Sequence, residues 1–322
     1  MIARAWIGFA GLVLVGCGGE AVMDADAAGG AEDAGLADAG AEMAVDAASA
    51  PDAGPLDAGP LRMDPVLPSA TGACPDMTTT GAVMVSPMGL TPREVRIWVG
   101  EAAGDNDGPL VFFWHGAGGS PTEATYALGA AAEEITAAGG IVVAPTHDPA
   151  AGTFPWFLTA GGTREDDLVI ADEVVACAES SIGIDEHRIH VVGFSAGAMQ
   201  TVQMSFRRAS YVASVVSYSG GLVSARMPRT DAADARFAAM ILFGGERDEV
   251  VINFATASQS YLDVLSRGPG YFGFLCDHGM GHTVPSAAIP HAWRFLQDHP
   301  FGMHPHAYEE GLPEGFYAPC SL

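Results

Sequence analysis

The sequence has no lysine and few basic residues of any kind. Its 322 residues include 14 basic and 39 acidic side chains, which gives a formal net charge of −25. Proteins that bind nucleic acid need a basic surface, so this balance argues against that class of function. Part of the acidic excess lies in residues 18–64, where eleven Asp or Glu and one Arg contribute −10 of the −25.

Residues 18–70 lack aromatic side chains and contain few branched aliphatic ones. They repeat Asp-Ala-Gly and Ala-Asp-Ala, with proline from Pro51 onward. Such a segment cannot bury enough apolar area to offset the entropy lost on ordering, and its Gly and Pro spacing opposes a helix. We therefore expect residues 17–73 to form an extended, self-repelling tether.

No apolar run at the N-terminus is long enough for a stable membrane span. Arg4 precedes an apolar stretch that starts at Ala5 and ends in Leu14-Val15-Gly16-Cys17, the form of an export signal. This ending resembles the lipobox of bacterial lipoproteins, in which cleavage precedes a cysteine that is then lipidated. The resemblance implies a signal peptide at residues 1–16, lipidation at Cys17, and a place in the cell envelope or outside the cell. Gly18 after the cysteine favours the outer membrane; the alternative is a plain signal peptide.

Four further cysteines remain: Cys74, Cys177, Cys276 and Cys320. An even set in an exported protein predicts disulfide bonds, with three possible pairings. Because the termini of single domains often lie close together, we expect a Cys74–Cys320 bond. Cys177 and Cys276 would then be paired with each other or free.

Strand and helix patterns alternate from Cys74 to the end of the chain. The expected strands are 81–86, 93–100, 109–114, 141–144, 188–192, 211–217, 238–243 and 271–276, and the expected helices are 121–138, 163–181, 196–208, 251–267 and 287–297. This alternation predicts one α/β catalytic domain at residues 74–322, with a mostly parallel sheet and helices on both faces. Catalytic groups in such sheets lie beyond the carboxyl ends of the strands.

A G-x-S-x-G motif, Gly193 to Gly197, lies between an expected strand and an expected helix. The motif alone is weak, because roughly 0.3 chance matches are expected at this Gly and Ser content. Its context is more specific, since a strand that breaks sharply into a helix exposes the central residue in a strained conformation. Ser195 is therefore the candidate nucleophile.

Two later strands also end in polar side chains. Asp248 follows the strand at 238–243, and His282 follows the strand at 271–276. The order Ser, Asp, His is that of α/β-hydrolase triads, so we expect His282 to act as the base and Asp248 to orient it. The competing candidates are His278 for the base, and Glu246, Glu249 and, more distantly, Asp277 for the acid.

The strand at 109–114 runs into a glycine-rich loop, His115-Gly-Ala-Gly-Gly-Ser120. A tetrahedral intermediate needs hydrogen-bond donors for its oxyanion, and we expect the backbone N–H groups of Ala117 and Ala196 to supply them. A phosphate-binding loop would end in Lys-Ser or Lys-Thr, which this loop lacks.

These motifs resemble the secreted esterase family of polyhydroxybutyrate depolymerases, feruloyl esterases and acetylxylan esterases over about residues 80–300. The matching stretches are His115–Ser120, Phe154–Phe157 with Arg164–Asp167, Gly193–Gly197, Phe243–Asp248 and Gly281–Pro285. The resemblance implies an α/β-hydrolase fold and a serine carboxylic-ester hydrolase. In one departure, Val284 stands where family members often carry Trp, which predicts a smaller pocket wall.

We expect the substrate to contact His115, Gly116 and Trp156, although Trp156 could equally be a core residue. No cofactor and no metal are expected, because the C-terminal histidines lack the spacing of helical metal ligands. The expected partners are a small or polymeric ester and, through the lipid alone, a membrane; no nucleic acid is expected, and the protein should be a monomer. The alternative function is a surface lipoprotein that uses the fold only for binding. A third hypothesis is a peptidase of the same fold, but we expect no propeller or other gating domain that would suggest it.

Overall fold

The structure is a computed structural model that describes residues 63–159, 161–268 and 270–322. The expected signal peptide, the lipidation site at Cys17 and the tether up to residue 62 lie outside the described residues. No helix within the described part of the chain is long and apolar enough to cross a membrane.

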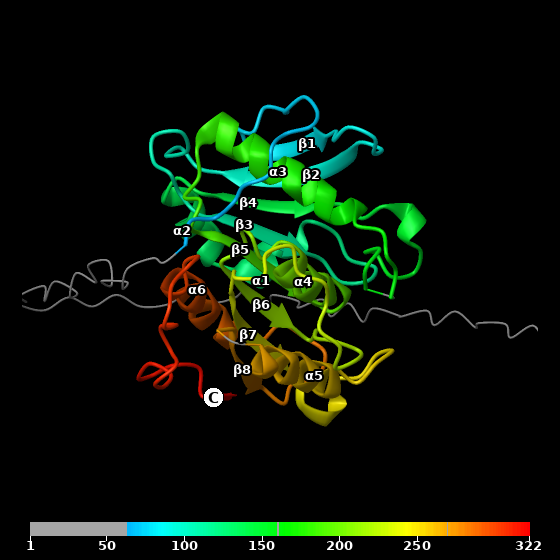
Figure 1. Ribbon diagram of the computed structural model, residues 1–322, viewed down its shortest axis with the longest axis vertical. Coiled ribbons are helices and arrows are strands. Elements are labelled where there is room, and N and C mark those ends of the chain that lie inside the picture. Colours follow the sequence, from blue (N-terminus) through cyan, green and yellow to red (C-terminus); the bar gives the residue numbers. More distant parts are fainter. Residues whose placement is uncertain (1–62, 160, 269) are drawn as a thin grey trace, which may run out of the picture. The chain divides into compact units, whose positions relative to one another are not determined.

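A single sheet of nine strands organises the described residues, in the order β1-β2-β4-β3-β5-β6-β7-β8-β9 (Figure 1). The strands are β1 (Gly81–Val85), β2 (Arg93–Val99), β3 (Leu110–Trp114), β4 (Ile141–Pro145), β5 (Ile189–Phe194), β6 (Ser214–Tyr218), β7 (Ala238–Phe243), β8 (Phe272–Asp277) and β9 (Cys320–Ser321). Strands β4, β3 and β5 to β8 are parallel, while β2 runs antiparallel to β1 and β4, and β9 to β8. The predicted mostly parallel sheet is confirmed.

Helices cover both faces of this sheet, because successive side chains of the buried strands point to opposite sides. Leu110, Phe112 and Trp114 of β3 belong to one apolar cluster, and Val111 and Phe113 to the other. The first cluster includes side chains of α3 (Asp166–Ile182), α4 (Ala196–Arg207) and α5 (Phe254–Arg267). The second includes side chains of α1 (Glu123–Leu128), α2 (Ala131–Ala137) and α6 (Ile289–Asp298).

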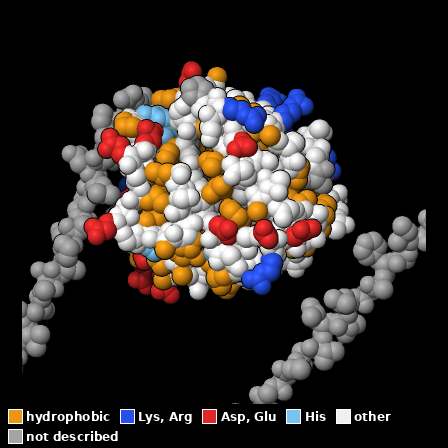
Figure 2. Space-filling view, turned by 90° about the horizontal axis from the view of Figure 1, so that it is seen from below, with side chains coloured by type: hydrophobic (Ala, Val, Ile, Leu, Met, Phe, Trp, Pro, Cys, Tyr) orange, Lys and Arg blue, Asp and Glu red, His pale blue; other side chains and the backbone are white. Residues whose placement is uncertain are grey.

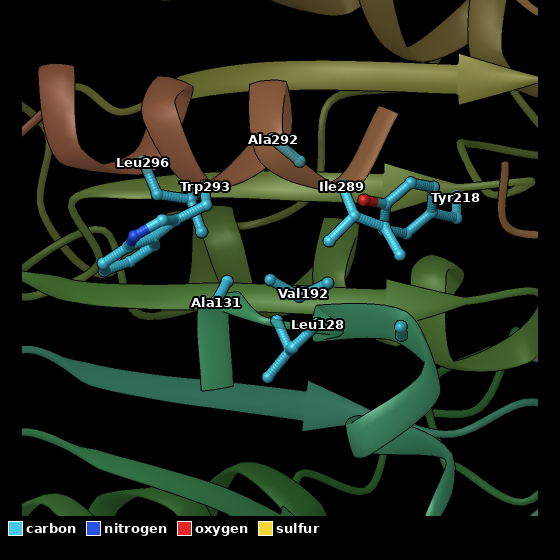
Figure 3. A pocket seen from close by; sticks show the side chains of 9 residues that line it. Leu128, Ala131, Val192, Tyr218, Ile289, Ala292, Trp293 and Leu296 are labelled. Carbon is cyan, nitrogen blue, oxygen red and sulfur yellow. The ribbon is translucent and has the colours of Figure 1, made fainter. Parts of the chain in front are cut away.

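The close-up in Figure 3 shows how the second layer packs. Ile289, Ala292, Trp293 and Leu296 of α6 point towards Val192 and Tyr218 of the sheet and towards the residues of α1 and α2. The space between them measures about 10 Å³, and its lining is apolar. A void of that size holds at most one water molecule, so this space is a small packing gap and not a ligand site.

Two elements of the structure differ from the expectation. The helix expected at 121–138 is divided into α1 and α2, because Gly129 ends the first helix with φ of 51°, a conformation that L side chains rarely adopt. The short strand β9 was not expected at all. It has only two residues, and its pairing with β8 cannot be inferred from periodicity over so short a stretch.

The folded part begins before Cys74, so the tether boundary expected at residue 73 lies too far along the chain. Val66 N donates to Ser210 O at 2.8 Å. The carboxylate of Glu173, a buried residue of α3, accepts hydrogen bonds from Thr71 N, Thr71 Oγ1 and Gly72 N. These contacts come mainly from the backbone, which explains why the composition of residues 63–73 did not predict them.

The expected Cys74–Cys320 disulfide is wrong. The structure pairs Cys74 with Cys177 of α3, and Cys276 of β8 with Cys320 of β9. Cys276 and Cys320 face each other directly in the antiparallel β8–β9 pair. Cys74 precedes β1, which lies at the opposite edge of the sheet from β9, so the two ends of the folded part are held apart.

Candidate active site

Ser195 lies at the turn between β5 and α4, with φ of 57° and ψ of −122°. A positive φ is uncommon for a residue other than glycine and stores strain at this position. A Cβ at Gly193 would lie 2.4 Å from Gly197 O, and one at Gly197 would lie 1.9 Å from Trp114 O. Only glycine fits at both positions, so the expected sharp strand-to-helix turn is confirmed.

Three side chains from separate strand ends meet in a hydrogen-bonded chain. His282 Nε2 lies 2.9 Å from Ser195 Oγ, and His282 Nδ1 lies 2.7 Å from Asp248 Oδ1. Ser195 follows β5, Asp248 follows β7 and His282 follows β8. Because these strands are parallel members of one sheet, their carboxyl ends lie along one edge, and that edge brings the three residues together.

Asp248 is fully buried and accepts three hydrogen bonds. Its Oδ1 faces His282, while Oδ2 accepts from Ser219 Oγ at 2.7 Å and from Gly244 N at 2.9 Å. Burial opposes the charged form, but the bonds from His282, Gly244 and Ser219 outweigh it and lower the pKa of Asp248. The carboxylate is therefore charged at neutral pH and faces the imidazole.

Two aromatic rings fix the imidazole of His282. The Phe254 ring stacks on it with 4.7 Å between ring centroids, and the Phe194 ring lies tilted at 4.9 Å. The side chain of His282 keeps 20% of its surface exposed. The ring is thus oriented by its neighbours and still reachable by a substrate.

The competing acid and base candidates are not part of the hydrogen-bonded chain that joins Asp248, His282 and Ser195. His278 Nδ1 accepts a hydrogen bond from Met280 N at 3.3 Å, and Asp277 Oδ1 accepts from Gly279 N. Glu246 and Glu249 are exposed. The structure brings His282, and not His278, to Ser195.

The glycine-rich loop lies against Ser195, the candidate nucleophile. A Cβ at Gly116 would lie 3.3 Å from Ser195 Cβ, and Gly116 N donates to the Glu123 carboxylate at 3.3 Å. Ala196 is the first residue of α4, where an N–H has no acceptor within the helix. Neither Ala196 N nor Ala117 N donates to another group among the described residues, so both N–H groups are free to bind an anion.

The predicted substrate contacts of His115 and Trp156 are wrong for their side chains, because both are fully buried. Trp156 Nε1 donates to His115 O at 3.0 Å, and His115 Nδ1 lies 2.8 Å from Gly116 O. Burial lowers the pKa of His115 to about 4, so its ring is neutral. The side chains of His115 and Trp156 therefore hold the glycine-rich loop through its backbone carbonyl groups. Val284 is also buried, so its side chain packs in the core and does not form an open pocket wall.

Two structural supports of the site were not found from the sequence. Ser219 is buried, has φ of 50° and bonds Asp248; a Ser-Gly-Gly run after a buried strand was the available signal. The second support is the buried ion pair between Arg93 and Asp167. Asp167 Oδ2 also accepts from Phe157 N, which fixes the segment that carries Trp156.

We expect Ser219→Ala to lower kcat/KM about tenfold, because a hydrogen bond to a charged group contributes about 1.5–3 kcal/mol. KM should change little. The acidic limb of the pH–rate profile should move to higher pH, because the loss of a hydrogen-bond donor raises the pKa of Asp248. Steady-state kinetics across pH tests this.

Two matched variants separate the bond from other effects. Ser219→Gly removes the same donor while relieving the positive φ, so it should lose the same activity. Ser217→Ala truncates a nearby buried serine whose Oγ has no partner, and it should retain activity. A fully active Ser219→Ala protein would contradict the role.

Residues 170–300 match the phospholipase/carboxylesterase family of α/β-hydrolases. Among solved structures, the native form of pOPH has a TM-score of 0.61 at 18% identity, covering 77% of this chain and 96% of its own. A complex of a pOPH variant with DMSO has a TM-score of 0.62 at 17% identity, covering 77% and 95%. A thermostable esterase has a TM-score of 0.53 at 20% identity, covering 70% of this chain and 64% of its own. No curated protein matches the sequence significantly.

The fold is that of the α/β-hydrolases, as the sequence predicted. The family match assigns the class: the chain is an enzyme, a carboxylic-ester hydrolase.

Proposed function

We propose that the protein is a serine esterase that acts through an acyl-enzyme, with Ser195 as nucleophile, His282 as base and Asp248 as orienting acid. The observation that supports this most is the hydrogen-bonded chain from Asp248 through His282 to Ser195, at 2.7 and 2.9 Å. Both distances lie within the range that proton transfer requires. The strained turn presents Ser195 at the N-terminus of α4, where the helix dipole favours developing negative charge.

The reaction follows from these positions. Ser195 Oγ attacks the ester carbonyl as His282 Nε2 takes its proton, and charged Asp248 stabilises the imidazolium. The N–H groups of Ala117 and Ala196 bind the oxyanion. His282 then donates its proton to the leaving alcohol, and a water molecule activated by His282 hydrolyses the acyl-enzyme.

The proposed substrates are polyhydroxyalkanoate-type, feruloyl or acetyl esters. The support is the resemblance of the His115–Ser120, Gly193–Gly197 and Gly281–Pro285 motifs to the secreted esterases. One structural neighbour is a thermostable esterase, which agrees with ester hydrolysis in general.

The proposed location is the cell envelope, through a lipid on Cys17. The support is the apolar stretch that ends in Leu14-Val15-Gly16-Cys17. Several acyl chains on one cysteine would give a durable anchor. The domain would then act on esters within reach of the tether.

A substrate panel tests the proposed function. We expect the purified protein to hydrolyse short p-nitrophenyl esters, and feruloyl, acetyl-sugar and hydroxybutyrate esters should then differ in kcat/KM. The Ser195→Ala protein, prepared identically, is the control for background hydrolysis. A folded wild-type protein with no activity on any ester would contradict the proposal and favour the binding lipoprotein.

A further inference from the structure

A cleft of about 430 Å³ lies beside α4, the helix that follows Ser195. Side chains of α4 form one wall, and the segments that follow Trp156 and β6 form the others. The lining residues are Leu158, Thr159, Gly161, Thr163, Met199, Gln203, Arg207 and residues 221–224 and 226–229.

Ser195 is not among the residues that line the cleft; the lining residue of α4 nearest to it in the chain is Met199, and the cleft extends along α4 from there. Met199, Gln203 and Arg207 are spaced four residues apart, so they form one stripe on the helix surface. Met199 lies one turn after Ser195, and Arg207 lies twelve residues after it. At 1.5 Å per residue, the stripe extends roughly 18 Å from the nucleophile.

The lining of the cleft combines apolar and basic side chains. Leu158, Met199 and Leu222 are apolar, and Met199 lies one helical turn from Ser195. The far end carries Arg207, and Arg226 and Arg229 belong to the same lining. No acidic side chain lines the described part of the cleft, although the chain has 39 acidic residues against 14 basic ones.

The cations at this cleft are available to a ligand. Arg207 pairs with Glu165, but Arg226 and Arg229 are exposed, and neither forms an ion pair with any described residue. Arg267 donates to Ala225 O and adds a further positive charge to the same loop. Figure 2 shows one face of the molecule, on which the largest group of basic side chains lies at the upper right, and acidic side chains lie mainly at the left and along the lower side.

We propose that this cleft binds the acyl chain of a linear aliphatic ester whose far end carries an anionic group, a carboxylate or a phosphate. The apolar portion contacts Met199, Leu158 and Leu222, and the anion binds Arg226 and Arg229. This inference rests on the proposed function of Ser195. We assign the acyl part of the ester to the cleft, and not the alcohol part, because the acyl group stays attached to Ser195 through both steps of catalysis. Binding energy in the cleft therefore contributes to both steps.

Electrostatics gives the cleft its selectivity. A protein with a net charge of −25 repels an anionic ester in general, so such a substrate needs a local cationic site. Guanidinium groups bind both carboxylate and phosphate oxygens in a bidentate geometry. The attraction is partly exposed, so salt should weaken it.

Matched ester pairs test the inference on the full chain. The substrates are mono-p-nitrophenyl esters of adipate, suberate, sebacate and dodecanedioate, each compared with the same compound capped as a methyl ester. A second arm replaces the terminal carboxylate with a phosphonate, which separates the two sources of negative charge. We expect kcat/KM for the anionic member to exceed that of the capped member by about tenfold at one chain length and low salt, and the ratio to fall in high salt.

Three variants identify the residues. Arg226→Gln/Arg229→Gln should reduce the anionic-to-capped ratio to about one, and Arg226→Lys/Arg229→Lys should keep part of it. Arg294→Gln, on α6 and outside the cleft, is the control and should leave the ratio unchanged. Thermal unfolding shows that each variant folds.

The outcomes separate this inference from the proposed function. Hydrolysis that depends on Ser195 but shows no preference for either anion overturns the inference alone. A preference that survives in Arg226→Gln/Arg229→Gln also overturns it. Hydrolysis that persists in Ser195→Ala overturns the proposed function.

Discussion

Alanine at Ser195 or His282 is expected to lower kcat by a factor on the order of 10⁴ or more. Ser195 Oγ and His282 Nε2 are 2.9 Å apart, so removing either one ends the transfer of the serine proton. The double variant should be little worse than each single one, because the groups act as one unit. Asp248→Ala should also be severe but milder, since a misoriented imidazole keeps some activity. Steady-state kinetics on a p-nitrophenyl ester measures all four.

Matched variants at the competing positions complete this experiment. His278→Ala and Glu246→Gln should stay close to wild type, because among the described residues neither side chain forms a hydrogen bond with Ser195 or Asp248. An inactive His278→Ala protein combined with an active His282→Ala protein would reverse the assignment of the base.

Loss of the Cys74–Cys177 disulfide is expected to cost about 3–5 kcal/mol of unfolding free energy in the chain-entropy model. The bond closes a loop with a sequence separation of 103 residues and fixes the start of the domain to α3. Cys74→Ser/Cys177→Ser should therefore unfold at lower urea concentration with an unchanged active site. Urea titrations followed by circular dichroism give the difference in free energy.

The second disulfide provides an internal control. Cys276 and Cys320 are separated by 44 residues, so their removal should cost about 0.8 kcal/mol less than removal of the first bond. Equal stability of Cys74→Ser/Cys177→Ser and wild type, or Cys74 found as a free thiol in non-reducing peptide maps, would contradict the pairing.

The sequence predicted much of the fold because its signals are local. The continuous apolar run at 109–114 indicated a strand buried on both faces, and β3 is buried along its whole length. The glycines of the G-x-S-x-G motif indicated the strained turn at Ser195. The order of Ser195, Asp248 and His282 after three strands then favoured their meeting at one sheet edge, where the structure brings them together.

What the sequence did not predict depends on which strands are neighbours. Strand β4 lies between β2 and β3, which differs from the order along the chain, and β1 and β9 lie at opposite edges of the sheet. Because that order separates Cys74 from Cys320, a pairing based on the closeness of the termini failed. The burial of Trp156 and the bond from Ser219 to Asp248 likewise depend on the packing of distant segments.

Covalent labelling of the intact protein by a fluorophosphonate, followed by peptide mass spectrometry, tests the central assignment most directly. The probe reacts with a serine that a neighbouring base activates. We expect a single adduct on Ser195 in the wild-type protein and none in His282→Ala, with both proteins folded by circular dichroism. A folded wild-type protein that stays unlabelled and hydrolyses no ester would contradict the account and favour a binding lipoprotein.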